Sequence, residues 1–487
     1  MRREITFLRR GREVRLGDIA PTLTLLDYLR LTEHAVGTKE GCAEGDCGAC
    51  TVVLRKLVDD RLVYQPVNSC ILLAGQADGA EVITVEDLAD GAALHPVQQL
   101  MVDQHGTQCG FCTPGFIMVL LALYHAERAA PLDRATVNDW IAGNLCRCTG
   151  YRPIVDAALA SCGGRPADRF AAQEREVARA LGALADDDDL FVGSDASFFA
   201  APASVASLAK LYAAHSDAVL VGGATDVGLW ITKQLQVLPK IIWLGRVRGL
   251  DAIEDAPDAV TFGAMVSHEA AIPSLAAIDP DLGELMRRFA GKQIRTVGTI
   301  GGNIANGSPI GDTLPALIAA GATLVLRKGD NERRLPLEDY FLAYGKQDRA
   351  PGEFVVRVIL PNLPPGALYA AYKVSKRFDQ DISAVCAALY VLRDGARVTV
   401  ARLAFGGMAA TPKRATKAEA ALTGSNWSEI SIRRTMDALA KDFSPLTDQR
   451  GSAAYRLEVA QNLLLRFYLE SAGGAQTRVL DVAAVDA

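Results

Sequence analysis

The distribution of hydrophobic and polar positions changes character several times along this chain. Residues 5–16 contain two short apolar runs on either side of a glycine turn, which is typical of a β-hairpin. Residues 22–31 then place apolar side chains at helical spacing, with a threonine able to cap the helix. We therefore expect a small mixed α/β domain over residues 1–80.

The next part of the chain has helical periodicity. We expect a compact helical domain at 81–162, with cysteine- and glycine-bearing turns between its helices. The clearest helices are predicted at 97–101, 116–125 and 135–142. Residues 163–199 combine glycine and proline, a charged alanine-rich stretch and the acidic run 186–189, which is the composition of a linker. We interpret the acidic run as solvated linker rather than as a docking patch.

The second half alternates strand-like runs with glycine-rich loops and helical pieces. A larger α+β domain is expected at 200–365 and a final α/β domain at 366–475. Strands are predicted at 218–221, 240–244, 323–327, 354–360, 384–392 and 397–405, and late helices at 428–440 and 454–471. No segment recurs with a fixed period, which argues against a repeat protein.

Composition and charge narrow the class of protein. The 487 residues are 50% hydrophobic and 22% charged with a net charge of −6, as in an ordinary globular chain with several cores. No stretch carries the clustered Lys and Arg that nucleic-acid binding needs. The first residues lack the apolar core of a secretory signal, and the longest apolar run, 116–124, is far short of the ~20 residues that span a bilayer. We expect a cytoplasmic protein with neither membrane nor nucleic-acid partners.

Cysteines are concentrated in the first third of the chain. Eight of the ten lie between Cys42 and Cys148, and in a reducing compartment such a group favours metal or redox chemistry over disulfides. The first set, Cys42, Cys47 and Cys50 with Cys70 further on, has the spacing of plant-type [2Fe–2S] proteins. Its glycines allow a loop to wrap a cluster and aim N–H groups at sulfur. The alternative is a four-thiolate zinc site, which usually pairs cysteines two to four residues apart.

The second set is Cys109, Cys112, Cys146 and Cys148, again four thiolates for one two-iron cluster. Each pair lies beside a Gly or Pro where a predicted helix begins or ends. N–H groups and the positive end of the helix dipole can stabilise an anionic cluster at such a place. Cys162 and Cys386 stand outside both sets. We interpret these last two as small buried hydrophobic residues.

Two glycine-rich segments, 220–227 and 297–312, are candidate phosphate-binding loops. Neither has the G-x-G-x-x-G pattern that opens a helix in Rossmann dinucleotide sites. Consecutive glycines still let N–H groups converge on a pyrophosphate, and Thr225, Thr299, Asn303 and Ser308 offer hydroxyl or amide contacts. The alternative is two glycine-rich turns without a ligand.

The motifs CAEGDCGAC and QCGFCTPG followed by NLCRCTGYRP resemble, in this order, the iron–sulfur segment of the molybdenum hydroxylases. Within that family the resemblance is to the iron–sulfur and FAD subunit of bacterial xanthine dehydrogenases, and the glycine-rich segments extend it to nearly the whole chain. It implies an α+β multidomain protein: a β-grasp plant-ferredoxin-like domain, a four-helix [2Fe–2S] domain, an α+β FAD-binding domain of PCMH type and a C-terminal α/β flavoprotein domain. The eight cysteines of the two sets would then ligate two [2Fe–2S] clusters.

The resemblance also assigns contacts to FAD, carried over position by position. These candidates are Leu220, Val221, Gly222, Gly223, Ala224, Thr225, Asp226, Val227, Phe289, Thr299, Gly302, Asn303, Ser308, Asp312 and Lys373. Asp226 stands where the family has Glu, which shortens the reach of that carboxylate.

The activity implied by the resemblance is xanthine or hypoxanthine oxidation. Electrons would pass from a molybdopterin centre through the two clusters to FAD and then NAD. The molybdenum half is missing here, so we expect a molybdopterin-binding large subunit as partner, in a heterotetramer of two small and two large chains. Gln108 and Cys148 would face that partner. No catalytic residue is expected on this chain, and none of its six histidines pairs with another in sequence.

Two alternatives differ in class. One is the equivalent subunit of another molybdenum hydroxylase, acting on an aldehyde or a different N-heterocycle. The other is a zinc-stapled scaffold without redox activity.

Overall fold

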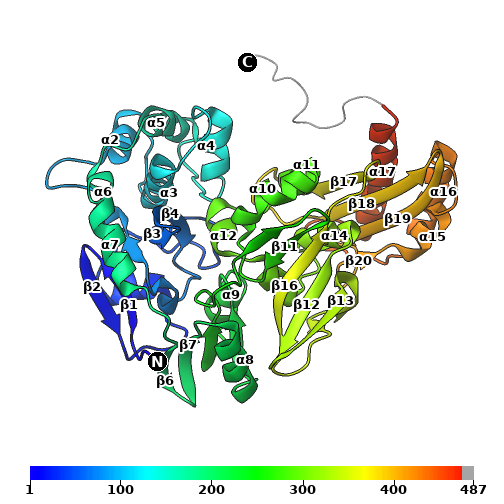
Figure 1. Ribbon diagram of the computed structural model, residues 1–487. Helices are drawn as coiled ribbons and strands as arrows, with labels where there is room; N and C mark the ends of the chain where they lie inside the picture. The colour runs from blue at the N-terminus through cyan, green and yellow to red at the C-terminus, as the bar shows by residue number, and fades with distance from the viewer. Residues whose placement is uncertain (474–487) are drawn as a thin grey trace. The chain divides into compact units, whose positions relative to one another are not determined.

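The computed structural model describes residues 1–473 and divides into two compact units, each described here by itself (Figure 1). Unit one comprises Met1–Leu250, Ser267–Glu269 and Ala290–Gly302, and unit two contains the remainder. The domain expected at 366–475 ends two residues outside the described part of the chain. None of the helices within residues 1–473 is long and apolar enough to cross a membrane.

Unit one begins with a mixed five-stranded sheet of order β2-β1-β5-β3-β4. Its strands are β1 (Ile5–Arg9), β2 (Arg12–Leu16), β3 (Thr51–Val58), β4 (Arg61–Asn68) and β5 (Glu81–Ile83). The predicted hairpin is confirmed as β1 and β2, which pair antiparallel, whereas β5 joins β1 in parallel. Thr24 caps the short helix α1 (Leu25–Asp27) by accepting a hydrogen bond from the Asp27 N–H at 3.0 Å. The result is the expected β-grasp domain.

Four helices follow: α2 (Pro96–Asp103), α3 (Thr113–His125), α4 (Arg134–Ile141) and α5 (Arg152–Cys162). They confirm the predicted helical domain, and Figure 1 shows them grouped together. Every residue of α3 from Gly115 to Tyr124 is buried. Because its sequence is apolar on all sides, this helix occupies the centre of the group.

The interval 163–199 is not the linker that its composition suggests. It forms α6 (Arg169–Ala172), α7 (Glu174–Leu184), β6 (Leu190–Ser194) and the start of β7 (Ser197–Ala201). Val177 and Leu181, one helical turn apart on α7, pack against Leu8 of the first sheet. The acidic run is exposed at Asp186, Asp187 and Asp188, as expected for solvated residues, although Asp186 also accepts from Arg246 at 2.7 Å and forms an ion pair with Arg2 at 2.8 Å.

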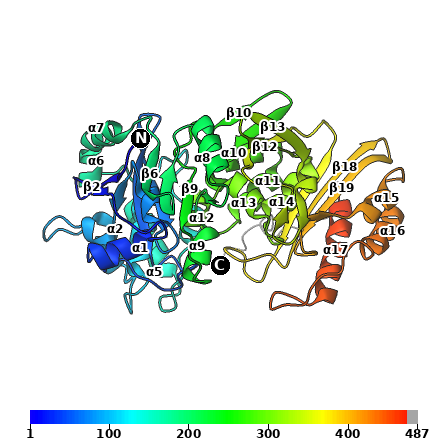
Figure 2. The ribbon, with the colours of Figure 1, turned by 90° about the horizontal axis from the view of Figure 1, so that it is seen from below.

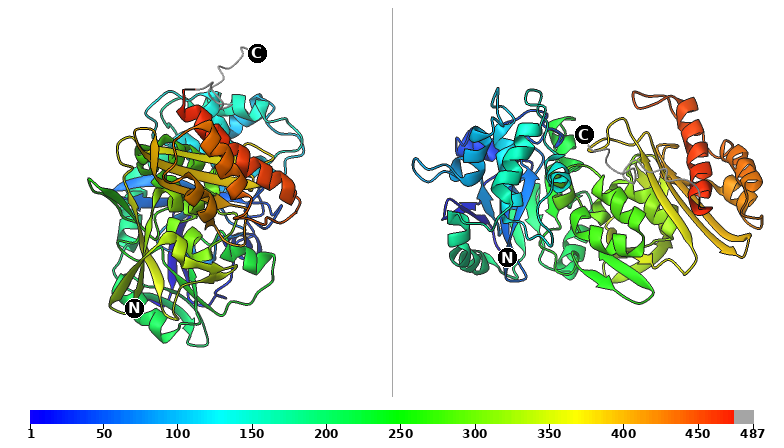
Figure 3. Two further views of the ribbon diagram at one scale, coloured as in Figure 1. Left: turned by 90° about the vertical axis from the view of Figure 1, so that its right-hand side faces the viewer. Right: turned by 90° about the horizontal axis from the view of Figure 1, so that it is seen from above.

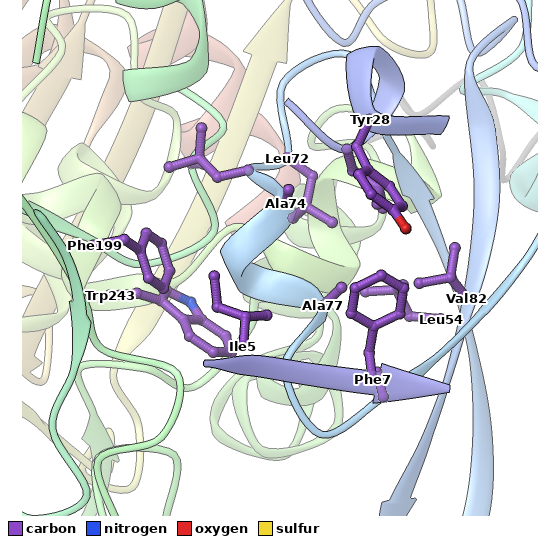
Figure 4. Packing of buried hydrophobic residues seen from close by; sticks show 14 of the residues in the cluster. Ile5, Phe7, Tyr28, Leu54, Leu72, Ala74, Ala77, Val82, Phe199 and Trp243 are labelled. Carbon is purple, nitrogen blue, oxygen red and sulfur yellow. The ribbon is translucent and has the colours of Figure 1, made fainter. Parts of the chain in front are cut away.

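A second sheet of unit one has the order β6-β7-β9-β8. The last two strands are β8 (Val219–Val221) and β9 (Lys240–Trp243), as predicted, and the accompanying helices are α8 (Val205–Ala214), α9 (Val227–Thr232) and α12 (Lys292–Val297). Phe199 of β7 and Trp243 of β9 lie close to Ile5 of β1 in one buried cluster (Figure 4). This shared core fixes strands β7 and β9 of the second sheet against the ferredoxin-like sheet within unit one.

Unit two contains an antiparallel sheet of order β10-β11-β16-β12-β13. Its strands are β10 (Ile253–Asp255), β11 (Ala259–Gly263), β12 (Thr323–Lys328), β13 (Asn331–Pro336) and β16 (Phe354–Pro361), and a small hairpin is formed by β14 (Phe341–Ala343) and β15 (Lys346–Gln347). Helices α11 (Pro280–Arg287) and α14 (Thr313–Ala320) belong to this unit, while α10 (His268–Ile278) and α13 (Ile300–Asn306) begin in unit one.

The C-terminal part of unit two is a four-stranded antiparallel sheet covered by helices. Its strands are β17 (Leu368–Val374), β18 (Val385–Asp394), β19 (Arg397–Gly406) and β20 (Lys413–Arg414), and its helices are α15 (Thr416–Leu422), α16 (Glu429–Leu439) and α17 (Ala453–Ser471). Val385, Ala387, Leu389 and Val391 alternate along β18 and share one core with these helices. The views in Figures 2 and 3 show the three helices gathered against this sheet.

Candidate iron–sulfur and flavin sites

Three cysteines of the first set, Cys42, Cys47 and Cys50, lie in a loop before strand β3, and Cys70 follows strand β4. The N–H groups of Glu44 and Cys47 point at Cys42 Sγ, at 3.5 and 3.4 Å. Asn68 on β4 donates from Nδ2 to the Gly45 carbonyl at 2.7 Å and holds the middle of the loop. N–H groups aimed at sulfur stabilise thiolates, so the loop has the geometry expected from its glycines.

The thiols of this set interact with one another. Hydrogen bonds from the Cys47 and Cys70 thiols lower the pKa of Cys42, and the same contacts raise the pKa of Cys47 and Cys70. Cys50 and Cys70 are buried, and Cys42 and Cys47 are half-buried. The fold therefore brings a distant cysteine on the chain, Cys70, to the loop, as its assignment as fourth ligand requires.

The second set lies at helix ends. Cys112 is the N-cap residue of α3, and Cys146 and Cys148 lie in the turn between α4 and α5. Burial and a hydrogen bond to Cys146 raise the pKa of Cys112 to about 12. Burial opposes the Cys146 thiolate, but the hydroxyl and N–H of Thr149, at 3.2 and 3.5 Å, outweigh it and lower its pKa. Cys109 and Cys148 are exposed, so this set opens to the surface of unit one.

The thiol spacing argues against a single zinc ion. Four thiolates on one tetrahedral zinc lie about 3.8 Å apart, given Zn–S bonds of about 2.3 Å. Within residues 1–473, the one group of three or more His, Cys, Asp or Glu whose ligand atoms all lie within 4.8 Å contains no cysteine. In a [2Fe–2S] cluster each iron takes two of the four thiolates, so the four sulfur atoms do not converge on one point, and the wider spacing of the thiols is compatible with that arrangement.

The two glycine-rich segments meet inside unit one. A Cβ on Gly223 would lie 1.9 Å from the Val297 carbonyl oxygen, so the backbones of 222–224 and 297–298 are in direct contact. Gln76 donates to the Gly222 carbonyl at 3.1 Å and fixes the loop to the ferredoxin-like domain. Across the described residues, the N–H groups of 223–225 donate to no backbone carbonyl. Neighbouring free donors of this kind fit a pyrophosphate.

The other flavin candidates are distributed over both units. In unit one, Thr299 accepts from the Gly302 N–H at 3.0 Å. In unit two, Asn303 accepts from the Thr313 hydroxyl, and Phe289 is half-buried just after α11. Ser308 accepts from the Ile310 N–H at 3.4 Å. The hydroxyls of Thr299 and Ser308, which were expected to face a ligand, thus also accept from nearby backbone N–H groups, whereas the Asn303 oxygen is held by a side chain.

Asp312 and Lys373 come together in unit two. Lys373 Nζ donates to Asp312 and to Ser383, the latter at 2.9 Å, and Ser383 donates to Asp312 at 2.6 Å. All three side chains are buried. The attraction between the two charges of such a buried pair is largely offset by the cost of removing them from water, so the pair depends on its hydrogen bonds. Cys386 beside it and Cys162 are buried as well, which confirms their interpretation as packing residues.

One polar cluster was not found from the sequence. Asp168 Oδ2 accepts from His95 Nε2 at 2.7 Å and His125 Nε2 at 2.9 Å, and all three side chains are buried. The Val97 N–H donates to His95 Nδ1, so the proton of neutral His95 lies on Nε2 and points at Asp168. The cluster is therefore a hydrogen-bonded anchor for α6 rather than a set of free metal ligands. Its histidines lie 30 residues apart, and no local pattern relates them.

Four protein families match successive parts of the chain. They are a 2Fe-2S iron-sulfur cluster binding domain at residues 10–75, a [2Fe-2S] binding domain at 84–159, an FAD binding domain in molybdopterin dehydrogenase at 194–363 and a CO dehydrogenase flavoprotein C-terminal domain at 370–471. Their order is that of the two cysteine sets followed by the flavin-like segments.

Nearly the whole of this chain is similar in sequence to two xanthine dehydrogenases. A xanthine dehydrogenase of Emericella nidulans is 33% identical over 98% of this chain, and a xanthine dehydrogenase/oxidase of Mus musculus is 29% identical over 96%. The chain spans 39% of the length of each.

Solved structures agree as well. A chain of carbon monoxide dehydrogenase from Hydrogenophaga pseudoflava matches at a TM-score of 0.52 with 29% identity, over 55% of this chain and 94% of that one. A chain of quinoline 2-oxidoreductase from Pseudomonas putida 86 matches at 0.51 with 26% identity, over 56% and 95%. With its cysteine sets, its flavin-like segments and these four family matches, the chain belongs to the molybdenum hydroxylases, as their iron–sulfur and FAD electron-transfer part.

Proposed function

We propose that this chain is the electron-transfer subunit of an NAD-dependent xanthine dehydrogenase. The observation that carries the proposal is that both cysteine sets and the flavin-like segments lie in one chain, which aligns over 98% of its length with a xanthine dehydrogenase. The rest of that relative is much longer than this chain. A molybdopterin-binding large subunit would therefore supply the site where xanthine or hypoxanthine is oxidised, in a cytoplasmic heterotetramer of two small and two large chains.

The ligand assignments are part of this proposal. The two clusters would be held at 1–80 by Cys42, Cys47, Cys50 and Cys70 and at 81–162 by Cys109, Cys112, Cys146 and Cys148. FAD would be held by the candidates of 200–365 and by Lys373 of the last domain. Clusters pass single electrons and flavin exchanges one or two, so the set would couple one-electron flow to hydride transfer to NAD.

The residues of unit one support an order for this flow. The second set has its exposed cysteines, Cys109 and Cys148, on the surface where a partner can approach. The loop of the first set lies against the flavin-like part instead, because Thr232 at the end of α9 donates to the Ala43 carbonyl at 2.6 Å. Helix α9 starts at Val227, the last residue of the glycine-rich segment 220–227. We infer that electrons enter at the second set and leave from the first.

A second candidate function has its own support. Carbon monoxide dehydrogenase and quinoline 2-oxidoreductase chains share the flavoprotein fold, so a partner that oxidises another N-heterocycle or an aldehyde remains the alternative.

The test is to purify the chain with the partner that binds it and to measure metal, flavin and turnover. We expect iron, FAD and molybdenum in the complex, and reduction of NAD with hypoxanthine. Turnover only with an aldehyde or another heterocycle would favour the alternative. Zinc without visible absorption from flavin or clusters would overturn the redox assignment altogether.

A further inference from the structure

Three segments of unit one meet at one buried polar network between the two cysteine sets. Gln293 on α12 donates from Nε2 to Asn144 Oδ1 at 2.7 Å and to Thr51 Oγ1 at 3.1 Å. Asn144 donates from Nδ2 to the Gly48 carbonyl at 3.0 Å. Gln293, Asn144 and Thr51 are 0, 1 and 1% exposed. Side-chain amides are rarely buried this completely, and here they join the first cysteine loop, the second cysteine turn and a helix of the flavin-like part.

The network surrounds a direct link between the two sets. The Leu145 N–H donates to the carbonyl of Cys47 at 3.0 Å. Cys47 is an expected ligand of the first cluster, and Leu145 directly precedes Cys146, an expected ligand of the second. One hydrogen bond therefore completes a path that otherwise consists of covalent bonds of Cys47, Leu145 and Cys146. Electron tunnelling weakens steeply with distance and is more efficient through bonds than through gaps.

The backbones of the first cysteine loop and of the second cysteine turn are in direct contact at Gly48 and Gly143. Gly48 has φ +69°, and a Cβ there would lie 2.3 Å from the Gly143 carbonyl oxygen. The Gly48 carbonyl also accepts from the Thr51 hydroxyl at 2.6 Å. The side chains of Asn144 and Thr51 thus orient the Gly48 carbonyl, one residue after the Cys47 carbonyl that accepts from Leu145, while Gln293 orients both side chains.

We propose that Asn144, held by Gln293, is a positioning residue for electron transfer between the clusters, with the Leu145 N–H to Cys47 carbonyl hydrogen bond as the bridge. The inference rests on the proposed function and deepens it. A cluster held by the second set would give one electron to a cluster held by the first set, so that the former is oxidised and the latter reduced. No bond forms or breaks and no proton moves. Substrate oxidation on the partner supplies the electron.

The test uses two nearly isosteric variants of the full, cofactor-loaded chain. Asn144→Asp keeps the oxygen that faces Gln293 and loses the N–H₂ that faces Gly48. Gln293→Glu keeps the shape of the side chain and loses both donated hydrogen bonds. The matched control is Gln98→Glu in the helical domain, where Gln98 accepts from the His95 N–H at 3.1 Å and donates to the Val85 carbonyl at 3.4 Å, both outside the two cysteine sets.

Electron paramagnetic resonance of the dithionite-reduced protein is the first readout, because two paramagnetic clusters in close contact split each other's signals. We expect both variants to retain both cluster signals and their iron but to lose part of this splitting, with slower electron exchange between the clusters. Hydrogen exchange should show faster exchange at the Leu145 amide. The control should match wild type in all three measurements.

Unchanged splitting, exchange rate and amide protection in both variants would overturn the proposal. Loss of iron from both would also overturn it, since the network would then hold the loops together rather than set their contact. Wild-type protein without two cluster signals would instead refute the proposed function, so the two failures are distinguishable.

Discussion

Gly223 occupies a point where a single methyl group has no room. Its Cβ would meet the carbonyl oxygen and carbon of Val297 at 1.9 and 2.3 Å, and backbone atoms cannot turn away as a flexible side chain can. Gly223→Ala should therefore push the loop off the second glycine-rich segment and lower the FAD content, at a cost of about 1–3 kcal/mol in stability. Flavin and iron per chain are the measurements. Gly164→Ala, where nothing lies within 4 Å, is the matched control. Equal flavin content in the two variants would contradict the assignment of this loop.

Cys148 tests the division of the cysteines into two sets. Serine cannot replace a thiolate as an iron ligand of comparable strength, so Cys148→Ser should remove or weaken the second cluster alone. We expect about half of the iron to be lost, since each set holds one two-iron cluster, with FAD and the first cluster signal retained. Cys162→Ser is the control, because Cys162 lies outside both sets and its buried Sγ donates to the Leu120 carbonyl at 3.5 Å. Two intact cluster signals in Cys148→Ser would refute the ligand set.

The candidate functional residues differ in how well they can be predicted from the sequence. Cysteine ligands recur at fixed spacings because the loop between them must reach around one cluster, so both sets were predicted from spacing alone. Asn144 and Gln293 are 149 positions apart and have no spacing rule. An amide becomes a structural link only when tertiary packing buries it beside a partner, and that packing is not visible in a one-dimensional pattern.

Elements were predicted well where their pattern was strong and poorly where charge masked it. The apolar runs of α3 and β18 were both predicted, because an uninterrupted apolar run agrees with the burial of these residues on every side. Helix α7 was not predicted because Arg, Glu and Ala surround a narrow apolar stripe, and the composition of the whole segment does not show that stripe. A helix such as α7 is therefore predicted from the apolar residues of its buried face, and not from the overall polarity of the segment.

Helix α7 makes a testable contribution through that stripe. Leu181 is 2% exposed and packs with Val177 against Leu8. Leu181→Ala should destabilise α7 and β1 by about 2–5 kcal/mol, the usual cost of truncating a buried leucine. Hydrogen exchange of the α7 and β1 amides measures this locally. Arg179→Ala on the exposed side of the same helix should stay within about 0.5 kcal/mol of wild type. Equal protection in the two variants would show that α7 is not anchored by this contact.

The Asp168 anchor predicts a pH dependence for α6. Burial disfavours the Asp168 carboxylate, but hydrogen bonds from His125 and His95 outweigh it and hold its pKa well below the ordinary value. A depressed carboxyl pKa stabilises the fold above the unfolded pKa of about 3.9, and this contribution is lost as the pH falls below it. Asp168→Asn keeps the cap on the Ala171 N–H, now 2.8 Å from Oδ1, but turns the other atom into a donor facing two donors. The variant should be less stable at neutral pH.

The check is hydrogen exchange or proteolysis of α6 as a function of pH. The difference between wild type and Asp168→Asn should shrink as the pH falls below about 4 towards the depressed pKa of Asp168. A difference that persists unchanged into strong acid would show that the charge of Asp168 plays no part.

At the scale of the whole molecule, the fold does not determine which compound accepts the electrons from the flavin. A xanthine dehydrogenase aligns with 98% of this chain and a carbon monoxide dehydrogenase chain matches 55% of it, so shape alone does not select NAD. If NAD is the acceptor, hydride transfer is reversible and NADH should reduce the isolated, loaded chain without its partner. One FAD takes two electrons and each cluster takes one, so complete reduction should consume about two NADH per chain. Bleaching of flavin and cluster absorption under nitrogen measures it. Full reduction by dithionite with none by NADH would retain the iron–sulfur and FAD assignment and reject NAD as the acceptor.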